Sequence, residues 1–452
     1  MLEKFFKLKE NHTDVKTEVL AGITTFMTMA YILAVNPTML ADAGMDKTAV
    51  LIATCLAAFV GTLVMALLAN YPFALAPGMG LNAYFAYTVC SDMGYSWQVA
   101  LMAVFIEGII FIVLSLTNVR EAIFNAIPAT LKKGVSAGIG LFIAFIGLQG
   151  AHIVVSNEST LLSGVKFAEN WNTEGICAVL ALIGLMVTAI LYIKKVKASI
   201  LIGILVTWIL GMLCQVTGIY HVDVKTGYYS LYPTLEMTDF SAITKTFGQC
   251  FNADFHNVGI FNFIVVLFSF LFVDMFDTLG TLIGVSDKAG MLDKDGKLPR
   301  VKQALLADAI ATSTGAVLGT STTTTFVESS AGVGAGARTG LSSVVTAFLF
   351  LISILFAPIF KAIPGFATAP ALIFVGFLMI SAIVKIDFED FTEAIPAYLC
   401  LIAMPLMYSI AEGIAIGVIS YVIINLICGK AKKITPLMYI LAVLFVCKYI
   451  FL

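Results

Sequence analysis

The sequence predicts an all-α polytopic membrane protein whose transmembrane segments form two inverted repeats of seven. The first observation is composition: 60% of the 452 residues are hydrophobic and 12% are charged, whereas soluble domains average roughly 45–50% apolar and about 25% charged residues. A soluble fold could not bury this excess. The second observation is a succession of fourteen apolar stretches, and the third is a set of matching motifs in the two halves of the chain.

Composition also excludes several functional classes. The net charge of −2 provides no basic surface, so we expect no nucleic-acid partner. The four histidines lie at or outside the ends of the apolar stretches without metal-ligand spacing, so we expect neither a metal site nor another cofactor. No serine or cysteine shares a motif with a membrane-embedded histidine, which argues against an intramembrane hydrolase and any other enzyme. The Lys- and Glu-rich start leads straight into an apolar stretch, so we expect no cleavable signal peptide.

The apolar stretches are the candidate spans, because a helix needs about 20 apolar residues to cross hydrocarbon. They cover residues 19–40, 50–68, 73–89, 99–116, 134–155, 176–193, 200–219, 260–284, 305–318, 326–337, 341–360, 369–384, 397–408 and 414–427. The remaining hydrophobic tail, residues 431–452, contains an apolar run at 436–452 that is long enough to span only if it includes Lys448. We expect this tail to lie along the membrane interface or to form an extra span.

The distribution of positive charge supports fourteen spans with a cytoplasmic N-terminus. In this arrangement, twenty of the 26 lysines and arginines lie on the cytoplasmic side and five on the other, as the positive-inside rule requires. The compact loops fit a multi-pass protein of a prokaryotic cell membrane.

The two halves of the chain carry collinear motifs on either side of a long polar loop, residues 221–258. The matches are IFNAIP at 123–128 with IFKAIP at 359–364, TEGI at 173–176 with TEAI at 392–395, and IG at 202–203 with IG at 416–417. Seven spans per half is an odd number, so the halves must have opposite orientations in the membrane. Inverted repeats of this kind are typical of secondary transporters.

Two corresponding spans, the third and the tenth, are interrupted. Pro77, Gly78 and Gly80 lie in the middle of the third span, so extended chain must precede a short helix there. In the tenth, the β-branched run 321–328 precedes a stretch of small residues at 329–336. We expect two short strands that pair with each other, because lipid cannot satisfy their backbone groups, and two helix starts that offer N–H groups to a ligand. The alternative is that the small residues only allow close helix packing.

Ionisable residues inside spans are costly and therefore mark functional sites. Asp274 and Asp277 lie three apart in the eighth span, Asp308 is in the ninth, and Glu328 opens the second half of the tenth. Each has a structural alternative: Glu328 could cap a helix, and Asp277 could bond only to nearby hydroxyls. Asp274 and Asp308 look more like supporting residues. Asn82, beside the first broken helix, offers a donor and an acceptor, or could cap that helix.

At these residues the sequence resembles the AzgA-like purine nucleobase permeases of the nucleobase–cation symporter superfamily. The resemblance covers nearly the whole chain. It rests on GITTFMTMAYILAVNP at 22–37, APGMGLNAYF at 76–85, FVDMFDTLGT at 272–281 and TTTTFVESSAGVGAGARTG at 322–340. Motifs of this length are highly specific.

The resemblance implies a uracil-permease-type fold. A core domain (1–120 with spans 1–4, and 259–360 with spans 8–11) would move against a gate domain (121–220 with spans 5–7, and 361–430 with spans 12–14). The implied substrate-binding residues are Gly80, Asn82, Asp277, Phe326 and Glu328, with Asp277 and Glu328 also coupling protons, and with Asp274, Thr278, Ser329 and Asp308 in support.

The expected function is import of purine nucleobases (hypoxanthine, guanine or adenine) by proton symport with alternating access. A purine is planar and uncharged, and its N–H donors need strong acceptors once they leave water, which Asp277 and Glu328 would supply. A carrier of anions or other small solutes is the rival on this architecture, but an anion would favour a cation where Glu328 stands. The other alternative is a channel, but the inverted repeat favours a transporter. The sequence does not indicate which purine is preferred or whether the coupling ion is H+ or Na+. It also does not indicate whether the protein is a monomer or a homodimer in the lipid.

Overall fold

The computed structural model describes residues 2–117, 127–157, 159–168, 170–223, 228–233, 237–256, 258–288, 290–291 and 298–451. The described chain is mostly helical, with two small two-stranded sheets. The predicted domain border at residues 120–121 and residues 123–126 of the first repeat motif lie outside the described residues.

Ten helical stretches in the described part are long and apolar enough to cross a membrane. They are Val15–Asp42, Lys47–Leu68, Trp97–Leu116, Ala129–Gly150, Trp171–Ile193, Ser199–Val216, Asn262–Leu279, Gly340–Lys361, Gly365–Lys385 and Ile410–Ile427. The corresponding helices are α2 (Val15–Met29) with α3 (Ile32–Asp42), α4 (Lys47–Leu68), α6 (Trp97–Leu116), α8 (Ala129–Gly150), α9 (Ile176–Ile193), α10 (Ser199–Val216), α11 (Ile260–Lys288), α14 (Gly340–Ser353) with α15 (Ala357–Lys361), α16 (Gly365–Ile380) and α18 (Ile410–Ile427).

The other four predicted spans have a different form. The third contains strand β1 (Leu75–Pro77), helix α5 (Met79–Ala83) and a π-helical segment (Tyr84–Asp92), and the tenth contains strand β4 (Thr323–Thr325) and helix α13 (Ser329–Gly334). The ninth is α12 (Val301–Leu318), and the thirteenth is the shorter α17 (Phe391–Leu406). The count of fourteen spans stays a prediction.

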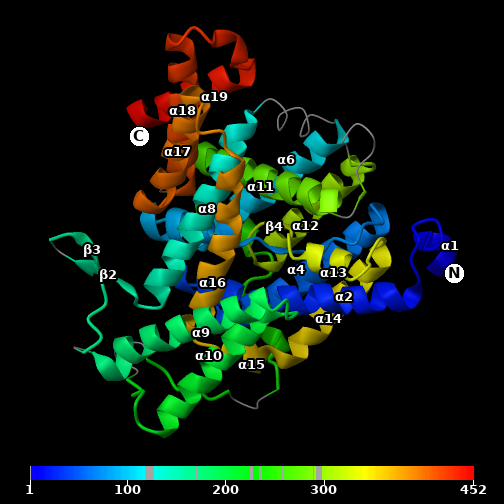
Figure 1. The fold of residues 1–452 in the computed structure, drawn as a ribbon, viewed down its shortest axis with the longest axis vertical. Helices are drawn as coiled ribbons and strands as arrows, with labels where there is room; N and C mark the ends of the chain where they lie inside the picture. Colours follow the sequence, from blue (N-terminus) through cyan, green and yellow to red (C-terminus); the bar gives the residue numbers. More distant parts are fainter. Residues whose placement is uncertain are drawn as a thin grey trace.

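The helices pack in two groups. Helices α2, α4, α6, α11, α12 and α14 pack on one another, and α8, α9, α10, α16, α17 and α18 form the second set. Figure 1 shows much of the second set on the left and α2, α4, α12 and α14 towards the right, with β4 near the centre. Close packing within the second set depends on small residues: a side chain at Gly134 of α8 would place its Cβ 2.9 Å from the Ala397 carbonyl oxygen of α17.

The connections add elements that the sequence pattern did not predict. Strands β2 (Val154–Asn157) and β3 (Leu161–Gly164) form an antiparallel hairpin between α8 and α9. In the long polar loop, short 3₁₀ turns at Phe240–Lys245 and Gln249–Asn252 return to the helices, where Lys245 pairs with Asp46 at 2.6 Å. At the chain start, helix α1 (Leu2–Phe6) buries Phe6 against Leu341.

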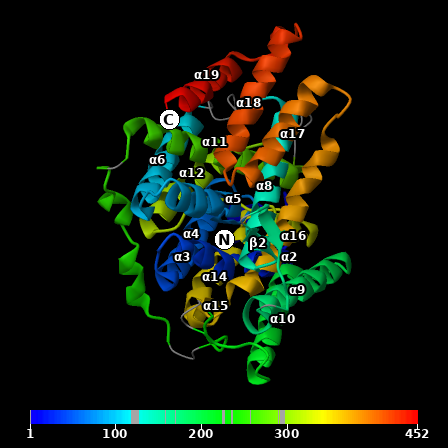
Figure 2. The same ribbon diagram turned by 90° about the vertical axis from the view of Figure 1, so that its left-hand side faces the viewer.

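The hydrophobic tail is helical. Helix α19 (Pro436–Phe451) packs against α18, and Tyr449 donates a hydrogen bond to Glu412. Figure 2 shows α19 beside α18 at the upper end of the molecule. The linker before α19 is fixed to the start of α17, because Lys430 and Lys433 pair with the N-cap residue Asp390 at 3.0 and 3.1 Å.

Candidate functional site

The two broken spans meet at a pair of short strands near the centre of the fold. β1 and β4 are antiparallel, with Ala76 opposite Thr324. The ladder continues at both ends, where the Gly78 N–H donates to the Thr322 carbonyl and the Phe326 N–H donates to the Ala74 carbonyl, both at 3.0 Å. The strand residues are buried. The predicted pairing is therefore present, and it satisfies backbone groups that lipid could not.

A threonine from a flanking helix fixes each strand. Thr62 of α4 donates to the Leu75 carbonyl at 3.1 Å and accepts from the Leu75 N–H at 2.9 Å. Thr312 of α12 donates to the Thr323 carbonyl at 3.1 Å. Each threonine lies in the second predicted span of its half, so in both halves a threonine at the corresponding span binds the strand backbone.

Glu328 precedes α13 and is half-buried. Its side chain makes no cap hydrogen bond to α13. Its Oε1 instead accepts a hydrogen bond of 2.6 Å from the Tyr31 hydroxyl, which is fully buried at the break between α2 and α3. Glu328 therefore does not act as a side-chain cap of α13, and its hydrogen bond is to Tyr31.

Asp277 of α11 lies at the hinge between β1 and α5. A Cβ placed on Gly78 would be 3.4 Å from its Oδ2 and 2.6 Å from Thr324 Cγ2, so only glycine lets the backbone pass between them. Asp277 is half-buried, and the charges of Asp308 and Glu328 both act on it. Asp277 thus lies beside Gly78, just after β1, and Glu328 lies just after β4.

Thr278 connects the two carboxylates that were predicted to be supporting residues. Its Oγ1 lies 2.9 Å from Asp274 Oδ1, 2.9 Å from Asp308 Oδ1 and 2.5 Å from Thr324 Oγ1. Both aspartates are fully buried. Thr278 therefore joins both aspartates to strand β4.

The other predicted site residues lie at the same crossing. Gly80 is buried where α5 touches α8 of the second helix group, and Ile139 is its nearest neighbour there. Asn82 is fully buried; its Oδ1 accepts from Ser321, and its Nδ2 has no hydrogen-bond partner among the described residues. Phe326 is buried, and Ser329 Oγ accepts from the Ala74 N–H at 3.0 Å. In this conformation Asn82 and Ser329 tie the two broken spans together.

Sequence reasoning missed three contributors. Tyr31 is the first. Glu107 of α6 is fully buried and accepts a hydrogen bond of 2.8 Å from the hydroxyl of Thr322, at the start of the second strand. Glu18 of α2 accepts the N–H groups of Arg338, Thr339 and Ser342 at 2.8–3.2 Å and so caps α14. The rule applied to the four other carboxylates, an ionisable residue inside an apolar span, would have found Glu107.

Two hollows of the described surface lie away from this crossing. One of about 420 Å³ is bordered by Lys9, His12 and Arg338, and one of about 480 Å³ is an apolar groove between α18 and α19. The buried polar groups, and not the hollows, indicate the site, because buried carboxylates are costly unless they have a function. Within the described residues, no group of histidine, cysteine and carboxylate side chains could hold a metal ion.

Comparison with solved structures concerns the fold. The transmembrane domain of the cyanobacterial bicarbonate transporter BicA matches with a TM-score of 0.64 at 16% identity, covering 89% of this chain and 97% of that one. The predicted helical, polytopic membrane fold is confirmed, while the inverted repeat stays a prediction.

Sequence comparison identifies the family. A putative permease of Methanocaldococcus jannaschii is 50% identical, covering 100% of this chain and 98% of its own length. The guanine/hypoxanthine permease PbuG of Bacillus subtilis is 46% identical with 100% of both chains covered, and the adenine permease AdeP of Escherichia coli is 42% identical, covering 100% of this chain and 96% of its own. The permease family model Xan_ur_permease matches residues 16–434. The resemblance found in the motifs is confirmed: the chain belongs to the Xan_ur_permease family, whose members are transporters and not enzymes.

Proposed function

We propose that the protein is a secondary active transporter that imports purine nucleobases by proton symport with alternating access. The names of its relatives, which include guanine/hypoxanthine and adenine permeases, support this substrate class. The observation that carries the proposal is the pair of half-buried carboxylates at the strand crossing: Asp277 beside Gly78, and Glu328 just after β4.

The pair suits a neutral, planar purine. The base presents N–H donors that lose their water on entry, so carboxylate oxygens are the acceptors that compensate best. Tyr31 occupies Oε1 of Glu328, which directs substrate donors to the other oxygen and to Asp277. The ring nitrogens of a purine are acceptors, and the backbone N–H groups at the start of α5 are the donors that we assign to them. The first N–H groups of α13 already donate to the carbonyls of residues 326–328.

The same pair explains the coupling ion. Asp277 and Glu328 are both half-buried at the strand crossing. Two carboxylates so placed resist carrying two negative charges together, and binding one proton relieves this repulsion. A proton and a neutral base can therefore enter as one unit. Sodium is the alternative coupling ion.

Alternating access requires two bodies that move. We assign the core to spans 1–4 and 8–11 (1–120 and 259–360) and the gate to spans 5–7 and 12–14 (121–220 and 361–430). Packing within the two helix groups supports this division, and the matched threonines Thr62 and Thr312 support an inverted repeat. The distribution of lysine and arginine supports a cytoplasmic N-terminus.

An anion carrier is the rival, because the matched BicA fold belongs to a bicarbonate transporter. Among the described residues, the ionisable groups that we find at this crossing are carboxyl groups: Glu107, Asp274, Asp277, Asp308 and Glu328. They would repel an anion, whereas they accept the donors of a neutral base. This charge favours the nucleobase.

Uptake into liposomes tests the proposal. Purified protein should accumulate radiolabelled hypoxanthine when the interior is alkaline, and a protonophore should abolish the accumulation. Excess unlabelled guanine or adenine should compete, and bicarbonate should not. Accumulation driven by a sodium gradient alone would show that the coupling ion is sodium and not the proton. Failure to transport any purine, with or without a gradient, would overturn the proposal.

A further inference from the structure

Tyr31 lies at a break in the first span. Helix α2 ends at Met29, and α3 begins at Ile32. The break places the tyrosine ring wholly inside the protein, with its hydroxyl 2.6 Å from Glu328 Oε1. This distance is typical of an O–H group that donates to an ionised carboxylate, among the stronger hydrogen bonds in proteins. Glu328 is 297 positions away in sequence, so only the fold creates this contact.

The first span also holds the half-helix that carries Glu328. Helix α13 packs on α2, and a Cβ placed on Gly332 of α13 would lie 3.0 Å from the Ala21 carbonyl oxygen. Backbone packing thus fixes α13, and the tyrosine hydroxyl fixes the side chain that precedes it. The titratable groups that face Glu328 are Tyr31 from the first span and Asp277 from α11.

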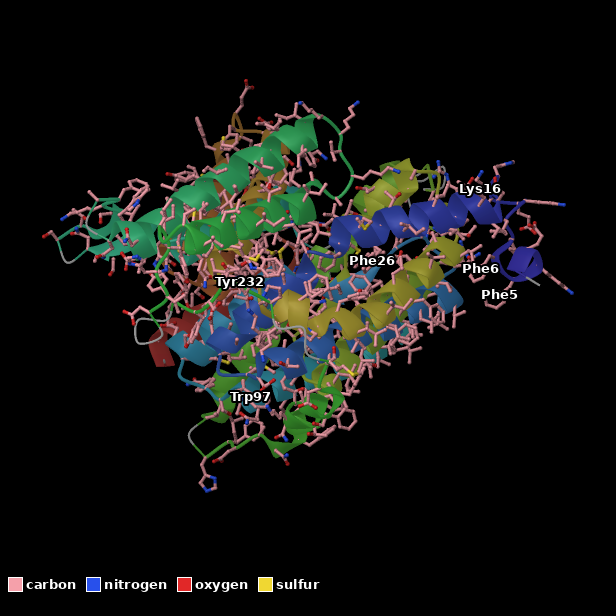
Figure 3. The ribbon with its side chains drawn as sticks, turned by 90° about the horizontal axis from the view of Figure 1, so that it is seen from below. Phe5, Phe6, Lys16, Phe26, Trp97 and Tyr232 are labelled. Carbon is pink, nitrogen blue, oxygen red and sulfur yellow. The ribbon has the colours of Figure 1, made fainter. Side chains whose placement is uncertain are left out.

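The same turn contacts the second helix group. Ala30, next to Tyr31, packs with Ala198 and Leu201 of α10, and Lys197 donates a hydrogen bond of 3.1 Å to Thr24 of α2. Figure 3 shows that the end of α2 near the labelled Phe26 lies closer to the green helices α9 and α10 than the end near Lys16. The Tyr31–Glu328 bond therefore lies beside the boundary at which the two groups would move.

We propose that Tyr31 is a positioning residue of the binding site: its hydroxyl saturates one oxygen of Glu328 and aims the other at the substrate. The proposal rests on the proposed function and adds a residue to its site. Because Tyr31 contacts the carboxyl group to which we assign proton exchange, it also affects the pH dependence of transport.

Replacing Tyr31 by phenylalanine removes the hydroxyl and keeps the ring. In liposomes, Tyr31→Phe should raise the KM for hypoxanthine roughly tenfold to hundredfold, the range for a lost hydrogen bond to a charged group, and should leave the maximal rate nearly unchanged. The pH profile of uptake should also differ from the wild-type profile, because Tyr31 contacts the carboxyl group to which we assign proton exchange.

Two further variants separate positioning from a general structural effect. Tyr421 is also a buried tyrosine whose hydroxyl donates to a glutamate, Glu393, at 3.2 Å, but in α18 and away from the crossing. Tyr421→Phe should keep the wild-type KM and pH profile. The double variant Tyr31→Phe/Glu328→Gln should bind no worse than Glu328→Gln alone, because Tyr31 acts through Glu328.

The outcomes are distinct. A wild-type KM and pH profile in Tyr31→Phe would overturn the proposal, as would an equal effect of Tyr421→Phe or a fully additive double variant. If Tyr31→Phe does not fold, the role is structural and the proposal fails. If the wild-type protein transports no purine, the proposed function itself fails, and the wild-type arm shows this before any variant is compared.

Discussion

Gly80 offers the sharpest test of how the two helix groups meet. It is the point in α5 that touches α8, and a Cβ there would lie 2.8 Å from Ile139 Cγ2, about 0.7–1.2 Å closer than carbon atoms normally pack. Isoleucine is branched at Cβ and rotates little in a helix, so it cannot easily give way. Overpacking of this kind costs about 1–3 kcal/mol.

The effect of Gly80→Ala should be on conformation more than on folding. We placed α5 in the core and α8 in the gate, so the clash penalises only those conformations in which the two helices touch. A penalty of about 1–3 kcal/mol shifts a conformational equilibrium roughly 5- to 150-fold. The initial rate of hypoxanthine uptake should fall by a factor in this range, while the melting temperature changes little.

A second substitution tests the cause. Ile139→Ala removes the clashing carbon, so the double variant Gly80→Ala/Ile139→Ala should recover most of the lost rate. Gly334→Ala is the matched control, because it lies in the other half-helix with nothing within 4 Å of the added Cβ. The reasoning is refuted if the double variant is as slow as Gly80→Ala, or if Gly334→Ala is equally slow.

Three other predictions follow from the charged groups. Glu328→Gln should raise the KM for hypoxanthine roughly tenfold to hundredfold, since a hydrogen bond to a charged group contributes about 1.5–3 kcal/mol, and should flatten the pH profile of uptake; a normal profile would exclude Glu328 from coupling. Asp277→Asn should bind purine, measured by calorimetry, without accumulating it on a pH gradient, and undiminished accumulation would exclude Asp277. Outside the membrane, hydrogen bonds from Thr392 and from its two lysine partners hold the pKa of Asp390 well below its usual 3.8. Its ion pairs therefore stabilise the fold above pH 3.8 and are lost as the pH falls further. Asp390→Asn can still cap α17, so it should lower the melting temperature at neutral pH but not in strong acid. Asp387→Asn is the control, because the Asp387 carboxylate accepts a local backbone N–H. It should leave the melting temperature unchanged at both pH values.

The sequence was sufficient for the features set by backbone chemistry. Pro77 followed by Gly78 disfavours a continuous helix, and a run of threonines favours extended chain. Unsatisfied strands inside a membrane need a partner, so β1 and β4 could be paired although they are far apart in sequence. Their register, with Ala76 opposite Thr324, could not be predicted from the sequence pattern.

Side-chain pairings were not predictable in the same way. Tyr31 reaches Glu328 and Glu107 reaches Thr322 across separations of 297 and 215 positions, and no local periodicity encodes such contacts. The hydrogen bond from Ser321 to the Asn82 oxygen was not predicted either, while the expected role of Asn82 in ligand binding stays a prediction. The β2–β3 hairpin was also missed, because that loop lacks a clear alternation of apolar and polar residues.

Proton movement is the most direct test of the account, in which Asp277 and Glu328 together bind a neutral purine and a proton. Liposomes that contain the protein and a pH-sensitive dye, with no imposed pH or sodium gradient, should acidify inside when hypoxanthine is added outside. Asp277→Asn should abolish this acidification. Entry of radiolabelled hypoxanthine into wild-type liposomes without any acidification would contradict the account.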